Sequence, residues 1–110
     1  MNEVLKLKEI NDLKNDYDKC DFYLNHLNSG NINYLNESID FSNKKYKEFC
    51  IKDTEVALMN TNFIPTNLDN LSQTKQNLIA IKTMISEIIY KKENDKEDLS
   101  YRFPFLPYGL

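Results

Sequence analysis

The sequence predicts an all-α protein on three observations. Only two glycines and three prolines occur among 110 residues, so few positions interrupt a helix. Apolar residues recur at intervals of three and four along three long stretches, which is the period of a buried helix face. The chain also lacks the alternating Val- and Thr-rich runs typical of strands. We expect a three-helix antiparallel bundle with coiled-coil-like packing over residues 1–93, then a polar hinge and an extended arm over residues 94–110.

The first helix is expected at about residues 3–28. Its apolar stripe consists of Ile10, Leu13, Tyr17, Cys20, Leu24 and Leu27. Further apolar residues lie beside the stripe and make this face wider than a two-stranded coiled coil requires, which favours a bundle: Leu5, Leu7, Phe22 and Tyr23. The pair Ser29-Gly30 is expected to end the helix, since glycine tolerates the left-handed conformation found just past a helix C-terminus.

The second segment, at about residues 33–60, allows two interpretations. The three-four spacing continues, with polar residues intruding, through Leu35, Ile39, Ser42, Tyr46, Phe49, Asp53, Val56, Asn60 and Phe63. The alternative is a short hairpin that pairs residues 48–51 with 55–59. Good helix formers dominate the segment and the connecting residues 52–54 contain no Gly or Pro, which favours helix. A break near Asp53 reconciles both patterns.

The third helix is expected at about residues 67–92, because Pro65 biases Ile64 away from helix. Its stripe is Leu71, Leu78, Ile81, Ile85 and Ile88, flanked by Leu68, Met84 and Ile89. Lys91 and Lys92 at its end complement the helix dipole. Three helices of similar length with short connections predict an up-down-up arrangement.

The last ten residues carry four aromatic side chains and two leucines around two prolines. The prolines favour an extended or polyproline-like backbone, which cannot bury such a row against itself. This arm is therefore predicted to occupy a groove, either in its own molecule or in another protein. The candidate partner-binding residues are Tyr101, Arg102, Phe103, Phe105, Leu106, Tyr108 and Leu110.

The residues needed for most chemistry are missing from the sequence. His26 is the single histidine, and the two cysteines, Cys20 and Cys50, do not form a Cys-x-x-Cys motif that could supply zinc ligands. The acidic run Asp16–Asp21 lacks the glycine and the final acid of a calcium loop, because Leu27 stands at the twelfth position. We expect no catalytic residue, metal or cofactor. In a helical hairpin the two thiols lie about 13 Å apart, so they are expected to stay free.

Charge and hydropathy exclude several classes of partner. The net charge of −3 provides no basic surface for nucleic acid. The best candidate stretch for nucleic acid, Lys44 to Lys47, has acidic neighbours. No apolar run approaches the roughly 20 residues of a membrane span. The N-terminus does not resemble a signal peptide. We therefore expect a cytoplasmic, reducing location.

These observations favour a non-enzymatic protein-protein interaction module, either an adaptor, a small subunit of a larger assembly, or a self-associating helical protein. Tyr17, Tyr34 and Tyr46 are expected to border the core with their hydroxyls in water. The alternative function is a small phage, viral or mobile-element regulator that inhibits a host factor by occluding a site. Small size, an excess of Asn, Lys and Ile residues suggestive of an AT-rich genome, and the absence of catalytic motifs are compatible with that alternative.

Overall fold

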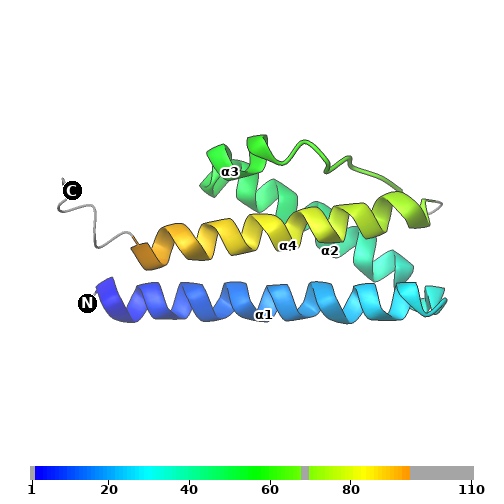
Figure 1. The fold of residues 1–110 in the computed structure, drawn as a ribbon, viewed down its shortest axis with the longest axis horizontal. Coiled ribbons are helices and arrows are strands. Elements are labelled where there is room, and N and C mark those ends of the chain that lie inside the picture. Colours follow the sequence, from blue (N-terminus) through cyan, green and yellow to red (C-terminus); the bar gives the residue numbers. More distant parts are fainter. Residues whose placement is uncertain (1, 68–69, 95–110) are drawn as a thin grey trace.

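The computed structural model describes residues 2–67 and 70–94, and all regular structure in them is helical. This confirms the all-α prediction. It also shows that the hairpin alternative for residues 48–59 is wrong, because those residues are helical on both sides of Asp53. The elements are α1 (Asn2–Asn28), a 3₁₀ helix η1 (Ile32–Tyr34), α2 (Leu35–Lys52), α3 (Thr54–Met59) and α4 (Leu71–Asn94) (Figure 1).

The directions of the helices differ from the predicted up-down-up arrangement. Helix α4 is antiparallel to α1, and ion pairs join Lys92 to Glu9 and Lys82 to Asp21. Helix α2 is also antiparallel to α1, so α2 and α4 point in the same direction (Figure 1). Between them, after the short helix α3, the chain travels back along the molecule through the non-helical residues 60–67. The three principal helices thus do not follow an up-down-up path.

The returning segment, residues 60–67, is here called the strap. The buried side chain of Asn77 on α4 holds the middle of the strap by bonding both the backbone N–H and the backbone carbonyl of Ile64. Asn77 Oδ1 accepts a hydrogen bond of 3.0 Å from the Ile64 N–H, and Asn77 Nδ2 donates one of 2.7 Å to the Ile64 carbonyl. The buried ring of Phe63 stacks on Tyr46 of α2 with 4.2 Å between ring centroids. The strap is therefore fastened to both parallel helices.

Helix α4 begins at Leu71, four residues later than the position predicted from Pro65. Asn70 acts as its N-cap, since Asn70 Oδ1 accepts a 2.9 Å hydrogen bond from the Gln73 N–H. The Asn70 carbonyl accepts from both the backbone N–H and the hydroxyl of Thr74. Pro65 indicates only where a helix is disfavoured, whereas the Asn70 cap determines where α4 begins.

Two helix boundaries predicted from local sequence are confirmed. At the end of α1, Gly30 has φ of +90°, its N–H bonds the Leu27 carbonyl, and the Asn31 N–H bonds the His26 carbonyl. This is the Schellman arrangement, in which glycine satisfies the last carbonyls of a helix. Helix α2 ends at Lys52, and Asp53, with φ of −132° and ψ of 55°, separates it from α3.

The predicted stripes form the core. Four α4 side chains are fully buried at its centre, and residues from the α1 and α2 stripes pack around them: Leu78, Ile81, Met84, Ile85, Ile10, Leu13, Cys20, Leu24, Leu27, Ile39 and Phe49. Ser38 and Ser42 of α2 are also buried, and their hydroxyls donate to the carbonyls of Tyr34, just before α2, and of Ile39 within it. That bonding explains how polar residues fit within an apolar stripe.

The wide apolar face expected on α1 is only partly used. Tyr23 is buried, but Leu5, Leu7 and Phe22 remain exposed among the described residues. Tyr17, Tyr34 and Tyr46 are partly buried and pack against the core, which confirms their predicted place at its border. The Tyr46 hydroxyl is also hydrogen-bonded to Cys50.

Candidate functional site

The predicted partner-binding residues 101–110 lie outside the described part of the chain. Among the described residues, several large apolar side chains are exposed on the surface. Met59 on α3 and Tyr90 on α4 are 71% and 68% exposed, and both border the same hollow. Exposed apolar groups that gather around a concavity are typical of binding surfaces.

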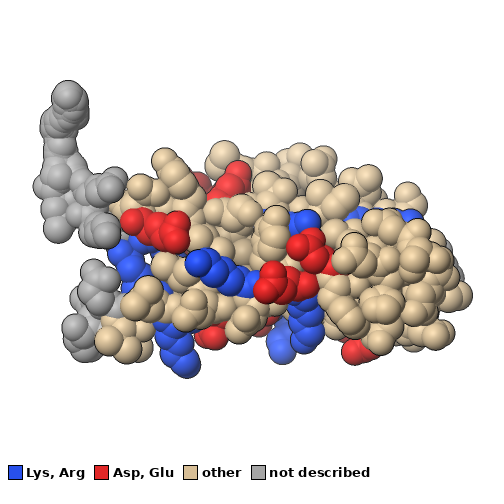
Figure 2. Space-filling view, turned by 60° about the horizontal axis from the view of Figure 1, so that its bottom comes forward, with Lys and Arg blue, Asp and Glu red and all other residues tan. Residues whose placement is uncertain are grey.

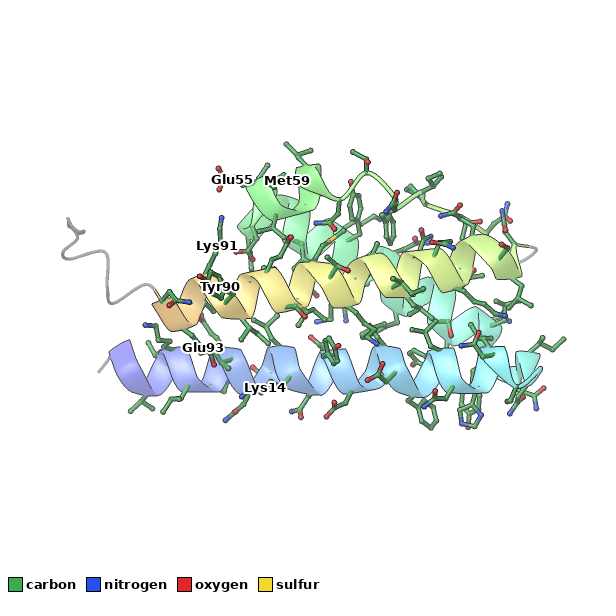
Figure 3. The ribbon with its side chains drawn as sticks, in the orientation of Figure 1. Lys14, Glu55, Met59, Tyr90, Lys91 and Glu93 are labelled. Carbon is green, nitrogen blue, oxygen red and sulfur yellow. The ribbon has the colours of Figure 1, made fainter. Side chains whose placement is uncertain are left out.

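This hollow, here called the α3–α4 hollow, has a volume of about 370 Å³. Buried Val56 contributes to its lining from α3, and Met59 and Tyr90 add a thioether and an aromatic ring (Figure 3). Its full lining is Val56, Met59, Ser86, Glu87, Tyr90 and Lys91. The two elements that form it are separated in sequence by the whole strap, so the hollow exists only in the folded protein.

Polar contacts between α3 and α4 border the hollow. Lys91 Nζ lies 2.9 Å from Glu55 Oε1, and Figure 3 shows the two side chains pointing toward one another. This hydrogen-bonded pair lowers the pKa of Glu55 and raises the pKa of Lys91. Asn60 Nδ2 donates a 3.3 Å hydrogen bond to Glu87 Oε1. An apolar centre with a polar border is the usual anatomy of a protein-protein contact.

A second hollow of about 420 Å³ lies on the α1 side of Tyr90. It shares Ser86 and Tyr90 with the first and is otherwise lined by Lys14, Tyr17, Asp18, Ile89 and Glu93 (Figure 3). The Tyr90 side chain therefore borders hollows toward both α3 and α1. Charged groups make this second hollow more polar than the α3–α4 hollow.

Sequence reasoning missed Tyr90, although its spacing carried a signal. Ile79, Thr83, Ser86 and Tyr90 follow one another at intervals of four, three and four, and all are exposed. They form an uncharged stripe on α4 outside the core stripe. An uncharged stripe beside the buried stripe of a helix indicates a second buried face or a contact face.

The carboxylates of α1 face a third hollow, of about 380 Å³, where lysines balance them. Lys45 lies 2.7 Å from Asp16 and 3.2 Å from Glu48. Burial works against its charge, but the hydrogen bonds that Lys45 donates to these two carboxylates raise its pKa. Asp16 is therefore partly buried and held in an ion pair. Lys45 is also engaged, which removes it from the stretch considered for nucleic acid.

His26 is held at the end of α1 by its neighbours. Its Nδ1 lies 3.2 Å from Asn31 Nδ2, and its ring centroid is 4.5 Å from that of Phe22 and 4.4 Å from that of Tyr34. This aromatic cluster belongs to residues 22–36, which contain no charged side chain. Figure 2 shows the contrast between this nearly uncharged end and the mixed acids and lysines over the rest of that face.

The two cysteines are both unpaired, as expected, and their surroundings differ. Cys20 is fully buried, and burial together with Asp16 and Asp21 raises the pKa of its thiol to about 12. Cys50 is only half-buried. Because the thiolate is the reactive form, the two sites should differ strongly toward a thiol reagent.

We expect one fast-reacting thiol per native chain at pH 8, belonging to Cys50, and a second that reacts only as the protein unfolds. Time-resolved labelling with an aromatic disulfide reagent, followed by peptide mass spectrometry, measures both rates. In urea the two rates should converge, and Cys50→Ser should remove the fast phase. Equal rates for both thiols in the native protein would contradict the burial of Cys20.

Comparison with protein-family models, curated proteins and solved structures yields no match for this chain. Within residues 2–67 and 70–94, no three His, Cys, Asp or Glu side chains converge in a way that could hold a metal ion. No helix in the same part of the chain combines the length and apolarity needed to cross a membrane.

Proposed function

We propose that this protein is a non-enzymatic protein-protein interaction module, an adaptor or small subunit of a larger assembly, whose described contact surface centres on Met59 and Tyr90. The observation that carries the proposal is the α3–α4 hollow. The described residues leave its apolar groups exposed, and a partner's apolar side chain would cover them. Burying one large apolar side chain contributes roughly 1.5–3 kcal/mol.

The residues around the hollow favour binding over catalysis. Tyrosine and methionine are enriched in protein contacts, where they provide large contact area and adapt to a partner's shape. The nearby charged groups already have partners, since Lys91 pairs with Glu55 and Glu87 accepts from Asn60. These pairs leave the border of the hollow polar and its centre apolar, as in contact surfaces with a few dominant anchors.

The test is capture from a native extract by immobilised full-length chain, with quantitative mass spectrometry. A genuine partner is expected to be enriched by the wild type and lost with both Met59→Lys and Tyr90→Lys, because either lysine places a charge at the apolar centre. The control is Leu58→Lys. Leu58 is 65% exposed on the same short helix but does not line the hollow, so its substitution should keep the partner.

Circular dichroism should show the same helicity for all three variants, since each replaces an exposed side chain. Proteins captured equally by wild type and both hollow variants, with none lost selectively, would contradict the assignment of this surface. The self-association version has a separate readout. If it holds, light scattering at micromolar concentration gives a mass above 13.0 kDa that falls with Tyr90→Lys.

A further inference from the structure

We infer that residues 101–110 of this chain occupy the α3–α4 hollow of their own molecule, so that an external partner must displace them. The inference rests on the proposed function, because it treats the hollow as a docking site. It adds that residues 101–110 occupy this site and compete there with an external partner. Four observations support it: the position of the last residue of α4, the apolar lining of the hollow, the acidic residues near it, and the length of the segment that connects α4 to residue 101.

The described chain ends close to the hollow. Asn94, the last residue of α4, is one turn beyond Tyr90, about 6 Å along the helix axis, and Asn94 Nδ2 donates a 2.7 Å hydrogen bond to the Tyr90 carbonyl. Residues 95–100, of which five are polar, span at most roughly 20 Å. That length is enough to reverse direction and place residue 101 beside Tyr90.

The chemistry of residues 101–110 matches the lining of the hollow. Phe103 and Phe105 are apolar aromatics that can contact the Met59 thioether and the Tyr90 ring, both of which pair favourably with aromatic rings. Arg102 is the single arginine of the chain, and two exposed acids, Glu87 and Glu93, flank Tyr90. An apolar segment led by one cation therefore meets an apolar hollow with acids nearby.

Tethering favours docking within one molecule over docking between two. A short flexible connection gives the attached segment an effective concentration in the millimolar range. A second copy at micromolar concentration competes poorly against it. The same tether lowers the apparent affinity for an external partner, since the partner binds only molecules whose hollow is open.

The first turns of α1 are the rival position for this segment. Val4, Leu5 and Leu7 are 71%, 54% and 58% exposed, and the ion pair between Glu9 and Lys92 places them near the end of α4. They stand on the outside of a helix, however, and none lines any of the hollows described above. The α3–α4 hollow offers walls from two elements and buries more of an aromatic side chain.

The experiment uses the absence of tryptophan from the chain. Phe105→Trp in the full-length protein introduces a single tryptophan, which can be excited at a wavelength that the seven tyrosines do not absorb, and its emission and acrylamide quenching report its exposure. We expect emission shifted to shorter wavelength than in urea, and slow quenching, both independent of protein concentration. Met59→Lys and Tyr90→Lys in this background should shift the emission toward that of the unfolded chain, and Leu58→Lys should leave it unchanged.

Three results would overturn the inference. The tryptophan could be as exposed in the native protein as in urea. Its emission could respond to Leu7→Lys and not to Tyr90→Lys, which would place the segment on α1. Its protection could appear only as concentration rises, which would mean docking on a second copy.

The two proposals fail separately. Truncation after Asp98 should increase capture of a partner that depends on Tyr90, because it removes the competing segment. If tryptophan protection depends on Tyr90 but no protein is captured in a Tyr90-dependent way, the docking inference stands and the proposed function fails. If capture depends on Tyr90 but truncation leaves it unchanged, the competition by residues 101–110 is disproved.

Discussion

Asn77→Ala is expected to destabilise the protein by about 3 kcal/mol, a cost in the upper range for single substitutions. The side chain is fully buried and makes two hydrogen bonds to Ile64 and accepts a third, of 2.8 Å, from Gln73 Nε2. Its loss removes these bonds and leaves a cavity among buried residues of α4. Urea denaturation measures the change, and the thermal midpoint should fall by roughly 12–24 °C.

Asn43→Ala is the matched control, because it also removes an asparagine that holds the strap. Asn43 donates one hydrogen bond of 3.3 Å to the Thr66 carbonyl, and its own Oδ1 is buried without a hydrogen-bond partner. Its loss should cost less than about 1 kcal/mol, since removing an unsatisfied acceptor offsets the lost bond. Similar thermal midpoints for both variants would show that the hydrogen bonds between Asn77 and Ile64 do not hold the strap.

Ile85→Ala is expected to destabilise the protein by about 3–4 kcal/mol through the cavity it opens in the core. Ile85 is completely buried at the centre of α4. Its neighbours come from helices on both sides, so their collapse into the vacated space is restricted. Chemical denaturation followed by circular dichroism measures the loss. The slope of the unfolding free energy against denaturant concentration is expected to stay the same.

Ile79→Ala is the matched control for that experiment. It makes the same chemical change in the same helix, but Ile79 is 48% exposed. The gain in helix propensity is common to both variants, so the difference between them isolates burial. Ile79→Ala should stay within about 0.5 kcal/mol of the wild type. A loss at Ile79 as large as that at Ile85 would mean that the exposed stripe of α4 is itself buried in solution, as in an oligomer.

The strap links the stability of the fold to the candidate site. It follows α3 directly, and Asn77 fastens it to α4, so the two walls of the α3–α4 hollow are tied together at one end. The ion pair between Glu55 and Lys91 ties them again near the hollow. Loosening the strap should therefore weaken binding at Tyr90 even where the helices themselves persist.

Local sequence determined the helices of this protein. The three-four spacing in each stripe, Gly30 at the end of α1 and the polar interruption at Asp53 depend only on residues within a few positions of one another. Such features follow from backbone geometry and side-chain periodicity. The same rules placed Ser42 on the buried face of α2, where the structure has it.

The tertiary structure alone decided how the helices run and where a contact surface forms. The parallel order of α2 and α4 depends on Asn77 bonding Ile64, and the α3–α4 hollow depends on Tyr90 coming beside Met59. Neither pairing has a periodic signal, because each joins residues far apart in the chain whose meeting depends on the packing of everything between them. Periodicity specifies which face of a helix is buried, and only packing specifies which neighbour buries it.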